Sequence, residues 1–203
     1  METTFAISAF VTLFVIIDPI GLSPLFVALT LGDDAARRRA IAVRAALTGF
    51  GILLVFGLVG EALLEAIGIS VAAFRIAGGL LLFATAFEML FEIRTKRREG
   101  QAEERPDPSI FPLATPLLAG PGSITTVILL AGTDGLSAVE VAGVFVITGL
   151  IVGLVLVAFL SATTIERVLT RTGILVLTRV LGMLLAALSV QFVIDGVRAA
   201  FFQ

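Results

Sequence analysis

Long apolar stretches separated by short polar segments make up most of the chain. They run over residues 4–31, 44–60, 71–91, 109–133, 141–165 and 174–199. A transmembrane helix needs roughly 20 mostly apolar residues. The first stretch contains one charged residue, Asp18, and the fourth and fifth contain none. The pattern predicts an all-α membrane protein with six transmembrane helices.

The connections between these stretches alternate in charge. The first, third and fifth carry the basic residues Arg37, Arg38, Arg39, Arg44, Arg94, Lys96, Arg97, Arg98, Arg105, Arg167 and Arg171. The opposite connections carry the acids Glu61, Glu65, Asp134 and Glu140. Cytoplasmic connections collect Lys and Arg, so we expect a multi-pass inner-membrane protein with both termini on the periplasmic side. Residues 94–108 form the predicted cytoplasmic linker, which is a solvated loop or, as the alternative, a site for anionic lipid.

Two motifs recur in the two halves of the chain. DPIGLSP, residues 18–24, corresponds to TPLLAGP, residues 115–121, and both place two prolines five positions apart. Arg75 and Gly78 correspond to Arg179 and Gly182. Three spans per half is an odd number, so the second half must cross the membrane in the opposite sense, as in many secondary transporters. We therefore expect a 3+3 inverted repeat, with residues 1–93 and 109–203 as its halves.

The proline pairs predict that the first and fourth helices are discontinuous, because proline removes a backbone donor and clashes with the preceding turn. The first helix is expected to stop near Asp18-Pro19 and restart at Pro24, with Ser23 as its N-cap. The fourth is expected to stop near Thr115-Pro116 and restart at Pro121, with Gly120 as its cap. A restarted helix presents free N–H groups and a partial positive charge, which suit a carboxylate. The alternative is that both motifs are kinks that only shape packing.

Asp18 is the strongest single candidate for a functional residue. A charge at the bilayer centre costs roughly 2.5–3.5 kcal/mol on insertion scales, so a carboxylate there is expected to have a function. It could accept a substrate ammonium, bind a coupling cation or carry a proton, or it could only cap the break. The hydroxyls of Ser123, Thr125 and Thr126 could bind a carboxylate or a cation, or cap the helix. The candidate substrate-binding residues are Asp18, Pro19, Gly21, Ser23, Pro24, Thr115, Pro116, Gly120, Pro121, Gly122, Ser123 and Thr125.

Further charges lie within the predicted spans. Arg75 and Asp195 fall near the outer surface, and Arg179 and Glu88 near the inner one. We expect two pairs, Arg75 with Asp195 and Arg179 with Glu88, which would act with Asp18 in gating or coupling. The alternative is that each side chain snorkels to the interface alone.

Composition narrows the function. The chain of 203 residues is 58% hydrophobic and 15% charged, with mean hydropathy +1.11 and net charge −2. It contains no Cys and no His, so disulfides, thiolate metal sites and His-based catalysis are excluded. No enzyme, cofactor or nucleic-acid partner is expected. Gly149 and Gly153 form a GxxxG motif, which predicts close helix packing or a dimer seam.

Three segments, DPIGLSPLF, FRIAGGLLLF and ATPLLAGPGSITT, give the chain a resemblance to the MarC family of integral membrane proteins. The resemblance implies a six-helix inner-membrane transporter of small neutral amino acids, chiefly glycine and alanine. It places the substrate, a small zwitterion, at the DPIGLSP and TPLLAGPGS segments, and it implies coupling to protons or membrane potential. The alternatives are a multidrug or small-solute exporter, disfavoured by the absence of Trp and Tyr, and a non-transporting scaffold.

Overall fold

The computed structural model describes residues 3–91, 107–133 and 135–201, and these are arranged in helices joined by short connections. In chain order the elements are α1 (Thr3–Ile17), α2 (Ser23–Leu29), α3 (Ala35–Ala66), α4 (Val71–Leu90), η1 (Ser109–Leu118), α6 (Pro121–Ala131), α7 (Ala138–Leu160) and α8 (Ala162–Phe201). The described residues include no strand, which confirms the all-α class. Most of the predicted linker, residues 94–106, lies outside the described residues.

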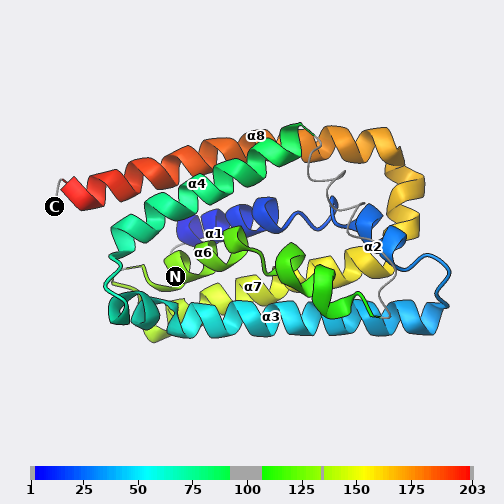
Figure 1. The fold of residues 1–203 in the computed structure, drawn as a ribbon, viewed down its shortest axis with the longest axis horizontal. Helices are drawn as coiled ribbons and strands as arrows, with labels where there is room; N and C mark the ends of the chain where they lie inside the picture. Colours follow the sequence, from blue (N-terminus) through cyan, green and yellow to red (C-terminus); the bar gives the residue numbers. More distant parts are fainter. Residues whose placement is uncertain (1–2, 92–106, 134, 202–203) are drawn as a thin grey trace.

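The broken helices lie between two pairs of long helices. Figure 1 shows α3 beside α7 along one edge and α4 beside α8 along the other, with α1, α2, η1 and α6 between them. Both pairs join corresponding helices of the two predicted halves. This layering puts both breaks in the central part of the molecule (Figure 1).

The described helices account for four or five membrane spans by length and composition. α3, α4, α7 and residues 172–201 of α8 are each long and apolar enough, and η1 with α6 forms a fifth candidate bent by 56°. α1 has 15 residues, or about 22 Å of helix, against a hydrocarbon core of roughly 30 Å. The first predicted span is therefore divided between α1 and the seven-residue α2, and six spans remain a prediction.

The connection predicted between the fifth and sixth spans is itself helical, which corrects the sequence expectation. α7 ends at Leu160 instead of residue 165, and α8 begins at Ala162. The N–H groups of Thr164 and Ile165 both donate to the Ser161 carbonyl, each at 2.9 Å, so a new helix starts at once. Thr170 then interrupts α8 with φ 56°. The sequence pattern missed this boundary because residues 161–165 carry no charged side chain that would mark the end of a span.

Glycines bring α4 and α8 into close contact. A Cβ built on Gly79 would lie 2.8 Å from the Ser189 carbonyl oxygen and 2.7 Å from a Val193 methyl. One on Gly196 would lie 3.0 Å from the Ala72 carbonyl oxygen. The predicted close packing at Gly149 and Gly153 is wrong within this chain: Gly153 faces open space, and Gly149 makes only ordinary contact with the Phe50 ring. A dimer seam there remains a prediction.

Gly79→Ala should lower the free energy of unfolding by about 1–3 kcal/mol, the usual cost of overpacking. The obstacles to the new methyl include the backbone of α8 at Ser189 and Val193, which cannot move aside as a side-chain tip can. Thermal unfolding in detergent, followed by circular dichroism, measures the effect. Gly153→Ala is the matched control and should be neutral or stabilising, because alanine favours a helix over glycine. An equal response of the two variants would contradict the tight α4–α8 contact.

Candidate functional site

The first break is built around Asp18. α1 ends at Ile17, and Asp18 adopts a left-handed conformation with φ 52°, which Asp tolerates better than most residues. Asp18 as a whole is 2% exposed, and its Oδ1 accepts the Gly21 N–H at 3.0 Å. A Cβ on Gly21 would collide with that carboxylate. Glycine at position 21 therefore allows the Asp18 carboxylate to approach the backbone closely. The predicted stop near Asp18-Pro19 is confirmed, and the carboxylate caps the break.

The restart of this helix differs from the prediction by one residue. α2 begins at Ser23, with Leu22 at the N-cap position and no side-chain cap. The Ser23 hydroxyl instead donates to the Pro19 carbonyl at 3.2 Å, and its N–H donates to the Ile20 carbonyl at 3.1 Å. Both bonds join Ser23 to the preceding turn, residues 19–22. The Ser23 side chain therefore does not act as the N-cap of α2. With only seven residues, α2 contributes a small dipole.

The second break lies between η1 and α6, and η1 is itself kinked, with non-helical backbone angles at Phe111, Thr115 and Pro116. The N–H of Ala119 donates to the Ala114 carbonyl, five residues back, at 2.8 Å, and Thr115 is extended (φ −130°, ψ 125°). The helix is therefore interrupted near Thr115-Pro116, as predicted, and the Ala119 bond closes a wide turn before α6. Gly120 is the N-cap of α6 and Pro121 its first residue, as predicted. A Cβ on Gly120 would collide with the Pro116 carbonyl oxygen.

The first turn of α6 lies against the end of α1. A Cβ on Gly122 would lie 3.6 Å from a methyl of Ile16, two residues before Asp18, and 2.8 Å from Leu82 of α4. A Cβ on Gly78 of α4 would collide with the Thr125 methyl, so glycine at this position leaves room for the Thr125 side chain. The structure therefore brings the two breaks, about 100 residues apart in the sequence, into one region between α1, α4 and α6.

Buried hydroxyls follow this contact along α6. Ser123 and Thr125 are each 3% exposed, and Thr126 is fully buried. Within the part of the chain that the structure describes, the Thr126 hydroxyl oxygen has no hydrogen-bond partner. A buried polar group without a partner costs about 1–3 kcal/mol. Thr126 thus has a buried hydroxyl with unused bonding capacity in the second turn of α6.

The predicted substrate-binding residues differ in burial. Seven are buried, namely Asp18, Pro19, Ser23, Gly120, Gly122, Ser123 and Thr125. Gly21, Pro24 and Thr115 are partly buried, and Pro116 and Pro121 are exposed. Because proline has no N–H to donate and interrupts its own helix, Pro116 and Pro121 are better suited to shaping the break than to binding a ligand.

The predicted gate residues lie along the α4–α8 contact. Gly196 packs against Ala72 and Ile76, so the antiparallel register puts Asp195 close to the level of Arg75. Gly182 packs against Ala86 and Met89, which puts Glu88 within about a turn of the level of Arg179. Arg75, Asp195 and Glu88 are partly buried and Arg179 is exposed. Asp195 accepts the Gln191 side-chain N–H at 2.8 Å, and the two ion pairs remain a prediction.

One ion pair ties α3 to the start of η1. Arg44 Nη2 lies 3.1 Å from Asp107 Oδ2, and Asp107 Oδ1 accepts the Ser109 N–H at 3.0 Å. Partial burial raises the pKa of Asp107, but the bonds from Ser109 and the guanidiniums of Arg44 and Arg37 outweigh it and hold the pKa below its ordinary value. The contact joins the first and third basic connections at one end of the bundle.

Sequence comparisons place the chain among membrane proteins of one kind. The model described as MarC family integral membrane protein matches residues 3–201. The UPF0056 membrane protein MJ1677 of Methanocaldococcus jannaschii is 36% identical over 204 residues, which is 98% of this chain and 99% of that protein. The UPF0056 membrane protein of Aquifex aeolicus is 38% identical, with 95% and 92% covered. UPF0056 membrane protein YhcE of Escherichia coli is 34% identical, with 95% and 91% covered. No solved structure matches. The chain belongs to the MarC family of integral membrane proteins.

Proposed function

We propose that the protein is a secondary transporter of small neutral amino acids of the glycine and alanine type. The observation that carries this proposal is the contact between the two breaks: the first turn of α6 lies against the end of α1, two residues before the buried Asp18 carboxylate. A helix N-terminus and an acid at one buried place suit the two ends of a zwitterion.

In this proposal the substrate carboxylate docks on the start of α6. This 11-residue helix carries a partial positive charge at its N-terminus, and the hydroxyls of Ser123 and Thr126 are buried within its first turns. The ammonium binds the Asp18 carboxylate or carbonyls freed at the breaks. Gly120 and Gly122 are closely packed against the Pro116 carbonyl oxygen and the Leu82 side chain, so the α6 N-terminus has room only for a small amino acid.

Alternating access follows from a proposed 3+3 inverted repeat with six membrane passes and periplasmic termini. The pairing of α3 with α7 and of α4 with α8 (Figure 1) supports this symmetry, because each pair joins corresponding helices of the two halves. The halves rock about the central site, driven by a proton gradient or the membrane potential, in the inner membrane. Binding stays modest, because over-tight binding slows turnover.

Uptake into proteoliposomes tests the proposal. Purified wild-type protein should give saturable uptake of labelled glycine or alanine under an imposed pH gradient or potential, compared with protein-free liposomes. Unlabelled alanine should reduce the uptake of labelled glycine, and unlabelled glycine should reduce the uptake of labelled alanine. Absence of uptake by well-folded protein under both gradients would reject the amino-acid carrier and leave the exporter and the scaffold.

The proposed outer gate makes a separate prediction. Arg75→Asp and Asp195→Arg should each slow uptake, because each puts like charges at one level of the α4–α8 contact. The double charge swap should restore most of the rate, with a coupling energy of about 0.5–3 kcal/mol in the double-mutant cycle. Arg198→Asp, an exposed change on the same helix, serves as the control. A swap that rescues nothing would exclude the pair.

A further inference from the structure

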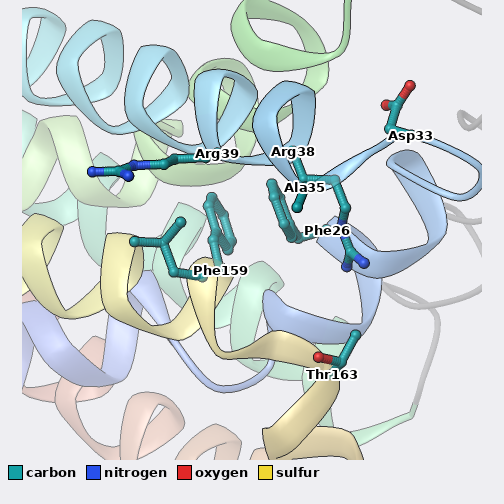
Figure 2. A pocket seen from close by; sticks show the side chains of 8 residues that line it. Phe26, Asp33, Ala35, Arg38, Arg39, Phe159 and Thr163 are labelled. Carbon is teal, nitrogen blue, oxygen red and sulfur yellow. The ribbon is translucent and has the colours of Figure 1, made fainter.

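A cavity of about 270 Å³ lies where α2, the start of α3 and the α7–α8 junction meet. Its lining includes Phe26, Arg38, Arg39, Phe159, Leu160 and Thr163. Figure 2 shows the rings of Phe26 and Phe159 face to face, with centroids 4.6 Å apart and planes 7° apart. Phe26 of the lining lies in α2, two residues after Pro24, but the lining includes none of the proposed substrate-binding residues.

The charge at this cavity is positive. The Arg38 guanidinium lies 5.9 Å from the centroid of the Phe26 ring, and in Figure 2 it extends toward Thr163, while Arg39 reaches the other side of the aromatic pair. The acid of the lining, Asp33, points away from the rings (Figure 2) and pairs with Arg37 at 3.0 Å. Among the described residues no carboxylate forms an ion pair with Arg38 or Arg39.

Apolar side chains of the lining lie beside the two arginines, and one of them is exposed at the surface. Phe26 and Phe159 are almost fully buried, whereas Leu160 is 51% exposed, and Leu31, two residues before Asp33 in the sequence, is 83% exposed. Large apolar side chains with this exposure are expected to face lipid. The cavity is smaller than the roughly 300 Å³ at which pockets for drug-sized ligands begin, so it admits a small headgroup and excludes acyl chains.

We propose that this cavity binds the headgroup of an anionic phospholipid. The guanidinium of Arg38 holds the phosphate, since arginine matches phosphate with paired N–H donors, and the Thr163 hydroxyl donates beside it. Arg39 supplies a second positive charge at the rim. The glycerol rests on Phe159 and Leu160, and the acyl chains leave along the exposed leucines. Basic pockets between transmembrane helices are typical sites for such headgroups.

Native mass spectrometry of the delipidated full chain in detergent tests the proposal. The probes are dioleoylphosphatidylglycerol and dioleoylphosphatidylcholine. Wild-type protein should bind the anionic lipid at least about tenfold more tightly, as expected for charge-assisted bonds. Arg38→Gln with Arg39→Gln should remove most of this preference. Arg37→Gln, which removes the same charge one residue earlier but lies outside the cavity, should change it less than about twofold.

Other outcomes would overturn the proposal. Equal binding of the two lipids by wild-type protein would do so without any variant, and so would full preference in the double variant. Inorganic phosphate that binds as tightly as the anionic lipid would assign the cavity to a soluble anion instead. If the double glutamine variant does not fold, Arg38→Lys with Arg39→Lys keeps the charge and should lose part of the preference, because lysine lacks the paired donors. A full preference in that lysine variant would exclude the paired-donor contact.

Discussion

Asp18→Asn should lower the rate of glycine uptake by at least about tenfold while leaving the protein folded. Asparagine keeps the shape of the side chain, can accept the Gly21 N–H through its own oxygen, and tolerates the left-handed conformation. The substitution therefore removes the charge and preserves the cap. A lost charge-assisted bond to the substrate ammonium costs roughly 1.5–3 kcal/mol, and about 1.4 kcal/mol corresponds to tenfold.

Two comparisons make this result specific. Glu65→Gln removes a carboxylate from the exposed end of α3 and should leave uptake unchanged. Asp18→Ala removes both the charge and the cap, so it should also lower the thermal stability. If Asp18→Asn transports like the wild type, Asp18 is only the cap seen in its bond to Gly21, and the ammonium must bind elsewhere.

Gly120→Ala should both destabilise the protein and impair transport. The new methyl would collide with the Pro116 carbonyl oxygen, which belongs to the backbone of the same break. The backbone must move, so α6 and its N-terminus shift relative to Asp18. We expect a loss of about 1–3 kcal/mol, the range for overpacking, measured by thermal unfolding in detergent. The rate of uptake per molecule of folded protein should also fall, because the shifted N-terminus of α6 no longer lies correctly relative to Asp18.

The matched control is Gly51→Ala in α3, where a Cβ would meet nothing within 4 Å. It should keep both stability and uptake, since alanine favours the helix. Normal uptake by Gly120→Ala would show that the position of α6 at the break is not critical for transport, and it would weaken the proposed carboxylate site.

Local patterns in the sequence were sufficient for the class of the protein and for the positions of most helices. The predicted third span, residues 71–91, differs by one residue from α4, and the breaks at Asp18 and Gly120 fall where the prolines indicate. These features depend on neighbours along the chain: a proline disrupts its own helix wherever that helix packs. The shift of the α2 start to Ser23 and the helix over residues 162–169 depend on backbone bonds that hydropathy does not report.

Only the tertiary structure decided which faces meet. It places Gly122 against Ile16 and sets the register between Gly79 and Ser189. It also forms the cavity that Arg38 lines, where α2, α3 and the α7–α8 junction meet. The sequence by itself determined an all-helical membrane chain with an acid and glycines at two proline-broken helices. It could not determine these contacts, because they join residues far apart in the chain and depend on how complementary helix surfaces fit together in space.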